Sequence, residues 1–253
     1  MCMPRTIRIP KLSRDGVKHA ALWAMLVNHA AQTFCQRGSV LFWILVYIGY
    51  ITAPVMCWFL VEGFYHTRSR KNYAFRLFVF AVLTQPIYHL WMLSSDTEPG
   101  ELNMLFQLLI CFLILAVRNL RVNILIRLFL EILLIVLSTF ATWYVFVPLE
   151  VILFDRAYQD SQKDPANARK IGAAAFAGAA LIVQISALGS TELTPTALLS
   201  SLAVIVAGIL VLYCHDGSLD NAAKRGWFQR YYFYAFYPAH LAIIALIKFV
   251  IAR

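Results

Sequence analysis

Charged side chains are scarce in this sequence. Of its 253 residues, only 14% are Asp, Glu, Lys or Arg, whereas 61% are hydrophobic. Ordinary soluble domains carry about 25% charged residues. A soluble domain of this length needs far more polar surface, so the composition argues against a cytosolic enzyme, and the same figures exclude a disordered chain. The class that remains is a protein that crosses a membrane several times.

Closely spaced cysteines are absent as well. The five cysteines stand at positions 2, 35, 57, 111 and 214, with no CxxC motif and no regular spacing. This pattern argues against a zinc module and against a disulfide scaffold. We therefore expect no metal site. Cys35, Cys57 and Cys111 have no base beside them in sequence, and we interpret them as packing residues.

Long apolar segments take the place of these features, and they predict an all-α, polytopic helical membrane protein. We expect about nine transmembrane helices, or eight to ten, within a single domain at residues 1–253. The first segment follows a polar, basic start and lacks a small-residue cleavage site, which favours an uncleaved first span. The segments are residues 17–35, 39–65, 74–93, 102–120, 123–139, 142–157, 171–188, 196–214 and 230–252.

The net charge of +9 has a distribution that indicates membrane topology. If the N-terminus is cytoplasmic, 19 of the 22 Lys and Arg residues fall on the inner side, and only Arg37, Lys248 and Arg253 fall on the outer side. This asymmetry follows the positive-inside rule. We therefore expect a multi-pass protein of the bacterial inner membrane that contacts lipid, and no nucleic-acid partner.

Two histidines lie deep within apolar segments. By helical rise, His29 is about 18 Å and His240 about 15 Å from the cytoplasmic ends of their segments, near the middle of a core roughly 30 Å thick. Ionisable groups at this depth are candidates for function, and the two rings could share one cavity. Asn28 and Gln32 add polarity beside His29, which favours function there. The alternative, a structural hydrogen bond between helices, is about equally favoured for His240.

A second candidate site follows the second apolar segment. Glu62 and His66 are four residues apart and therefore share a helix face. They are followed by Arg68, Arg70 and Lys71. Arginine forks suit phosphate groups, so the cluster could bind an anion at the membrane surface. The alternative is a stop-transfer cluster at a helix end, which needs no ligand.

Local spacing supports two further predictions. Arg127 and Glu131 are four residues apart, so we expect an ion pair within one helix. Pro54 and Pro86 are expected to kink their helices, and Gly49 adds freedom just before Pro54.

The most specific stretch of the sequence is APVMCWFLVEGFYHTRSRKNYAFRLFVFAVLTQPIYHL within residues 53–90. It resembles the core of the TraX family, the pilin acetylases of F-like conjugative plasmids and their bacterial relatives. The segments LWAMLVNHAAQ, ELNMLFQLLICFLIL and YYFYAFYPAHLAIIALI resemble, in order, the opening, middle and closing spans of the family. One departure is that the family usually has Asp before the first-span His, where this chain has Asn28.

The resemblance implies a membrane-embedded acetyltransferase that uses cytosolic acetyl-CoA. The phosphates of CoA would bind at His66, Arg68, Arg70 and Lys71. His29 would be the general base, with Asn28, Glu62 and His240 as further catalytic candidates. Asn28 can orient an imidazole but cannot stabilise an imidazolium as a carboxylate does.

The acceptor that the resemblance favours is the N-terminal amine of pilin. One alternative keeps the chemistry and transfers the acetyl group to a hydroxyl of a glycan or lipid. Others are a small transporter or a non-catalytic partner in pilus assembly. A transporter is disfavoured because the sequence shows no inverted repeat and no matched broken spans.

Overall fold

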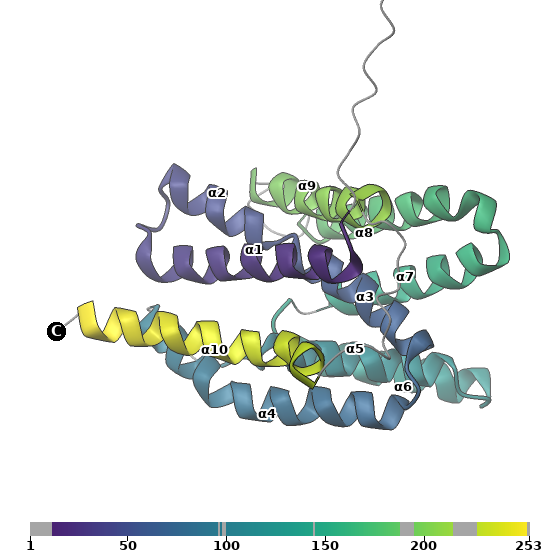
Figure 1. Ribbon diagram of the computed structural model, residues 1–253. Helices are drawn as coiled ribbons and strands as arrows, with labels where there is room; N and C mark the ends of the chain where they lie inside the picture. The colour runs from purple at the N-terminus through teal and green to yellow at the C-terminus, as the bar shows by residue number, and fades with distance from the viewer. Residues whose placement is uncertain are drawn as a thin grey trace, which may run out of the picture.

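Helices account for the architecture of the chain. The computed structural model describes residues 12–95, 97, 100–143, 145–187, 195–214 and 227–251. Within these ranges it contains no strand, and an isolated bridge joins Leu102 and Ala141. The prediction of an all-α protein is confirmed. The α-helices in Figure 1 are α1 (Arg14–Phe34), α2 (Val40–Gly49), α3 (Thr52–His66), α4 (Arg70–Ser94), α5 (Met104–Arg118), α6 (Ile124–Leu137), α7 (Phe146–Lys163), α8 (Ala168–Ala187), α9 (Pro195–Ile209) and α10 (Trp227–Ile251). Three short helices are η1 (Ser138–Phe140), η2 (Pro165–Asn167) and η3 (Leu210–Cys214).

The second apolar segment forms two helices. It breaks at Tyr50 and Ile51, so that α2 ends at Gly49 and α3 begins two residues before Pro54. The predicted interruption near Pro54 is confirmed. Gly49 also allows α1 and α2 to approach closely, since a Cβ atom at this position would collide with the side chain of Asn28.

The protein has an apolar exterior and polar groups inside, which is the reverse of a soluble protein. Among the residues that the structure describes, five helical segments are long and apolar enough to cross a membrane: Val40–His66, Arg70–Ser94, Pro165–Ile185, Ala197–Cys214 and Tyr231–Ile251. The shorter α6 exposes large residues such as Phe129 and Ile132 and buries only Glu131. The chain is thus a membrane protein. The buried polar side chains include Asn28, Glu62, Thr84, Asn103, Gln107, Asp155 and His240.

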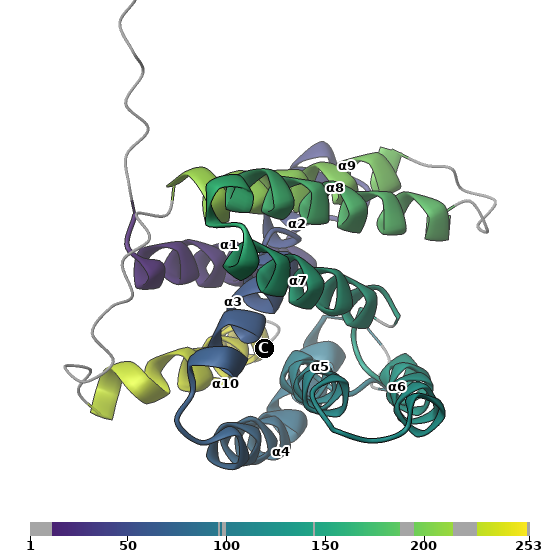
Figure 2. The ribbon, with the colours of Figure 1, turned by 90° about the vertical axis from the view of Figure 1, so that its right-hand side faces the viewer.

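Helix α1 lies between two groups of helices. It packs against α2 and α3 on one side and against α10 on the other, and α10 in turn packs on α4. Helix α3 crosses the interior and contacts α1, α5, α7 and α9, while α7, α8 and α9 pack in succession along one side (Figure 2).

The two ends of the bundle differ in composition. The last turns of α1, α4 and α10 gather at the left of Figure 1, together with the start of α2. The connections from α3 to α4, from α5 to α6 and from α7 to α8 lie toward the right. We call the end at the left the α10 end. We call the end at the right the basic end, because it holds Arg68, Arg118 and Lys163.

Candidate active site

His29 and His240 lie in direct contact although 211 residues separate them in the chain. Nδ1 of His29 on α1 is 2.8 Å from Nε2 of His240 on α10, and the rings stack with their centroids 5.0 Å apart. His240 is only 3% exposed, whereas His29 is partly exposed. At 1.5 Å per residue the pair lies about 22 Å along α1 from Arg14 and about 8 Å from Phe34.

The hydrogen bonds around the pair assign a tautomer to each ring. Nδ1 of His240 lies 2.8 Å from the carbonyl oxygen of Phe236. A carbonyl can only accept, so His240 carries its proton on Nδ1. Its Nε2 is then an acceptor and receives the N–H of His29 Nδ1. The free lone pair of neutral His29 therefore lies on Nε2, and this atom can accept a proton from a substrate.

A second layer of contacts fixes His29 from the α4 side. The ring of Trp91 meets the imidazole edge-on at a centroid distance of 4.6 Å, and its indole N–H donates to Oγ1 of Thr33 over 3.0 Å. Thr33 in turn donates to the backbone carbonyl of His29 over 2.9 Å and pairs with the hydroxyl of Ser95 at 2.7 Å. Trp91 thus contacts the imidazole ring directly, and Thr33 links Trp91 and Ser95 to the backbone of α1 beside it.

Asn28 faces α2 and does not act on the imidazole. Its Nδ2 donates to the carbonyl oxygen of Val46 over 2.8 Å, and its Oδ1 accepts a hydrogen bond from Gln32. The sequence-based expectation that Asn28 orients the His29 ring is therefore corrected. Consecutive residues of a helix point about 100° apart, so Asn28 clamps α1 to α2 while His29 turns toward α10. The orienting partner of His29 is His240.

Glu62 also lies away from the histidines. Its carboxylate pairs with Nε of Arg14 at 3.5 Å, and the residue is 8% exposed. Arg14 opens α1, so this ion pair lies on the order of 20 Å from His29. The structure thus brings His29 and His240 together and places Glu62 toward the basic end, where a direct contact with the reacting atoms at His29 is out of reach.

The expected anion site remains exposed at the start of α4. Arg68, Arg70 and Lys71 all face solvent there, and no ion pair of theirs with a carboxylate is found among the described residues. The guanidinium of Arg70 lies 4.1 Å from the ring centroid of Phe64, which fixes its position. Three accessible cations in one connection are suited to binding phosphate groups.

His66, the fourth residue of that site, points to α7. Its Nε2 lies 2.9 Å from the hydroxyl of Tyr158. Burial raises the pKa of this phenol, and the carboxylate of Glu62 adds to the effect. The phenol therefore stays protonated, and its hydrogen bond with His66 fixes the imidazole next to the basic connection.

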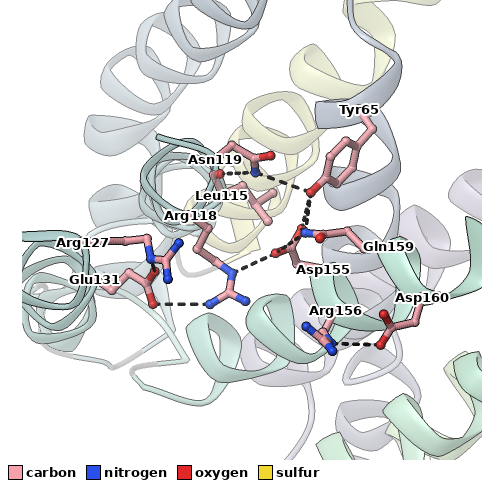
Figure 3. Close-up of polar contacts among 10 residues, drawn as sticks. All are labelled: Tyr65, Leu115, Arg118, Asn119, Arg127, Glu131, Asp155, Arg156, Gln159 and Asp160. Carbon is pink, nitrogen blue, oxygen red and sulfur yellow. Dashed lines mark hydrogen bonds and ion pairs between the residues drawn. The ribbon is translucent and has the colours of Figure 1, made fainter. Parts of the chain in front are cut away.

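A buried ionic network at the basic end was not predicted from the sequence. Figure 3 shows Arg118 donating to Asp155 over 2.8 Å and approaching Glu131 at 3.4 Å. Asp155 is fully buried and also accepts from the hydroxyl of Tyr65 over 2.7 Å. The expected pair of Arg127 with Glu131 is confirmed at 3.9 Å. The network joins α3, α5, α6 and α7 across the bundle.

This network borders a pocket of about 250 Å³. The pocket is lined by both signs of charge, and each carboxylate in it already has a cationic or hydrogen-bonding partner. The arrangement therefore serves first to hold four helices together. Local spacing in the sequence could not have revealed the network, because Arg118 and Asp155 are 37 residues apart.

Comparison with known proteins shows which family the chain resembles. The sequence model of the TraX protein family matches residues 13–248, which is nearly the whole chain. The probable fimbrial assembly protein FimC, serogroup H1, of Dichelobacter nodosus is 30% identical over 244 residues, covering 92% of this chain and 94% of that protein. No solved structure matches the chain. The chain belongs to the TraX family.

Proposed function

We propose that the protein is a membrane-embedded acetyltransferase that moves an acetyl group from acetyl-CoA to an acceptor, favoured to be the N-terminal amine of a pilin. The observation that carries the proposal is the hydrogen bond from His29 to His240. It leaves a lone pair on Nε2 of a partly exposed His29 inside a membrane protein. A pilus-related role is supported by the TraX family and by the relative named as a fimbrial assembly protein.

The chemistry needs one general base, and His29 supplies it. The acceptor amine attacks the thioester carbonyl while Nε2 of His29 removes its proton, so that an N–C bond forms. Collapse of the tetrahedral adduct breaks the C–S bond, and the imidazolium returns the proton to the departing CoA sulfur. Nε2 of His240 accepts the Nδ1–H of His29 throughout. That hydrogen bond strengthens when His29 becomes charged, which stabilises the transition state.

Acetyl-CoA would approach from the basic end. The exposed cations Arg68, Arg70 and Lys71 suit its phosphates, and His66 lies beside them. From there the pantetheine arm would extend along α1 toward His29. We further propose nine spans, with the N-terminus and the basic end in the cytoplasm of a bacterial inner membrane. The 19-to-3 partition of the cations supports this orientation.

The same base could act on a hydroxyl, and O-acetylation of a glycan or lipid is the second candidate. Its geometry at His29 is identical, so the acceptor alone separates the two functions. The relative named as a fimbrial assembly protein favours a polypeptide acceptor.

The test is acetyl transfer by the purified protein in lipid nanodiscs. Radiolabelled acetyl-CoA is supplied with peptides that carry a free or a blocked N-terminus, and in parallel with glycan and lipid hydroxyl acceptors. We expect label only in the peptides with a free amine, and none with His29→Gln. Label in hydroxyl acceptors would favour O-acetylation, and no transfer to any acceptor would overturn the enzymatic function.

A further inference from the structure

A pocket opens at the α10 end, on the far side of the histidine pair from the basic connection. It has a volume of about 490 Å³ and is lined by residues 32–37, Ser95 and Lys248. Pockets of this size hold small molecules or short peptide segments. We call it the terminal pocket.

The terminal pocket is one layer of side chains away from His29. Thr33 lines it and donates to the carbonyl of His29 over 2.9 Å. Trp91 lies directly behind Thr33 and touches the imidazole of His29. Along α1 the step from His29 to Thr33 is about 6 Å. A molecule in this pocket therefore lies close to the proposed base, from the side opposite the CoA site.

Two cations from opposite ends of the chain converge on this pocket. Arg37 follows α1 and Lys248 lies in the last turn of α10. They are two of the only three cations that the sequence places outside the positively charged side. The positive-inside rule disfavours cations there, so a shared position on one pocket calls for a reason. None of the described residues lining the pocket carries a carboxylate.

Hydrogen bonds from Nη2 fix the guanidinium of Arg37 and leave its other N–H donors for a ligand. Its Nη2 donates to the carbonyl of Ser95 over 2.7 Å and to Oγ1 of Thr97 over 3.0 Å. These bonds fix the guanidinium at the rim of the pocket. No hydrogen bond of Nη1 or Nε is found within the described part of the chain, and these donors suit a carboxylate.

We propose that the terminal pocket receives the first residues of an acceptor polypeptide, and that Arg37 and Lys248 bind an acidic side chain close to its N-terminus. This inference rests on the acetyltransferase function proposed above. It assigns the pocket to the acceptor and leaves the basic end to acetyl-CoA, so that the two substrates reach His29 from opposite ends of the bundle.

The geometry sets the position of the acidic residue. Arg37 lies eight residues after His29, a distance of roughly 10–13 Å along the helix direction. An extended peptide advances about 3.3 Å per residue. With the reacting amine at His29, the carboxylate near Arg37 belongs to about the third to the fifth residue of the acceptor.

The test is a scan of acceptor peptides with the purified protein in nanodiscs and saturating acetyl-CoA. The peptides are identical except for one Glu, placed in turn at the second to the eighth position, with an all-Gln peptide as reference. We expect kcat/KM to be about tenfold or more above the reference when Glu stands at the third to the fifth position, as for one charge-assisted hydrogen bond. A Lys at the same positions should lower it below the reference.

Variants connect the preference to the pocket. Lys248→Gln and Arg37→Gln should each reduce the preference for Glu while transfer to the all-Gln peptide continues, and Arg37→Glu should prefer the Lys peptide. Lys248→Gln keeps the inference testable if the loss of the Ser95 contact unfolds Arg37 variants. Arg121→Gln, which removes an exposed cation at the basic end, is the matched control and should keep the full preference.

The outcomes separate the two proposals. Equal transfer to every peptide by the wild type would overturn the acceptor inference and leave the acetyltransferase function standing. Preferential transfer to lipids with phosphate headgroups would overturn the polypeptide as the occupant of the pocket. Transfer to no acceptor at all would overturn the underlying function.

Discussion

His29 and His240 form a hydrogen-bonded pair in which the second ring is locked by the backbone and the first is left with a free Nε2. His29 donates to His240 over 2.8 Å, and His240 donates to the carbonyl of Phe236 over 2.8 Å. The two rings are therefore not equivalent. His29 has the atom that can react, and His240 positions it.

This asymmetry predicts different effects of the two histidine substitutions. His29→Gln should lower the transfer rate by about 10²–10⁴-fold, as for loss of a general base. His240→Ala should lower kcat by about 10–100-fold, the equivalent of one strong hydrogen bond, with the KM for acetyl-CoA unchanged. Initial rates and thermal unfolding in detergent would measure both.

The converse result would exchange the roles. Full activity of His29→Gln together with an inactive His240→Ala would make His240 the base. A protein whose activity and melting temperature fall together in both variants would indicate a structural pair. His19→Gln, at the far end of α1, is the control and should change neither quantity.

The exposed connection before α4 predicts a change in cofactor affinity. Arg68→Ala and Lys71→Ala should each raise the KM for acetyl-CoA by about tenfold, because each loses one charge-assisted contact with phosphate. Arg156→Ala is the control, since its exposed guanidinium pairs with Asp160 at 2.9 Å on the adjacent helix turn. Unchanged KM values in both test variants, with normal membrane insertion, would identify the cluster as a stop-transfer signal.

The part of the fold that depends on local spacing could be predicted from the sequence. The apolar segments are helices, the second one breaks near Pro54, and Arg127 meets Glu131 one turn away. These features depend on helical period and on proline stereochemistry, which act over a few residues.

Features that depend on how helices rotate against each other could not be predicted. Asn28 and His29 are neighbours in sequence and face different helices. The partner of Glu62 is Arg14, which precedes it by 48 residues. The sequence predicted that both histidines lie deep within their apolar segments, but only the packing of α1 on α10 decides that their rings meet.

The proposed orientation predicts which ends of the helices are reachable from outside the cell. In a variant with its native cysteines replaced, Gln36→Cys at the α10 end should react with a membrane-impermeant thiol reagent in intact cells. Lys163→Cys at the basic end should react only after permeabilisation. Both residues are exposed in the structure. The reverse pattern would invert the topology and place the terminal pocket in the cytoplasm.

The contacts of Asn28 predict that the residue usual in the family is harmful here. Asn28→Asp replaces the donor to the carbonyl of Val46 by a carboxylate in a site that is 7% exposed. A buried acceptor facing another acceptor should lower the stability by about 1–3 kcal/mol or more. Gln162→Glu, the same exchange of an amide for a carboxylate at an exposed position outside the terminal pocket, is the control. Higher activity with unchanged stability would instead mean that residue 28 acts on the His29 ring.

The last prediction concerns the buried network of Figure 3. Asp155 is fully buried and bound to Arg118, whose side chain is 24% exposed. Removing one member leaves the other charge without its partner, so Asp155→Leu or Arg118→Met alone should destabilise the protein by about 3–5 kcal/mol. The double variant Arg118→Met with Asp155→Leu should recover part of that loss, because apolar side chains of similar volume can replace a buried pair.

A double-mutant cycle measures this coupling from the melting temperatures of the four proteins. The exposed pair of Arg156 and Asp160 provides the matched cycle, for which we expect no more than about 1 kcal/mol. Additive losses at Arg118 and Asp155 would contradict a structural ion pair. If both single variants kept their stability but raised the KM for acetyl-CoA, the network would belong to the CoA site, because the guanidinium of Arg118 borders the pocket at that end.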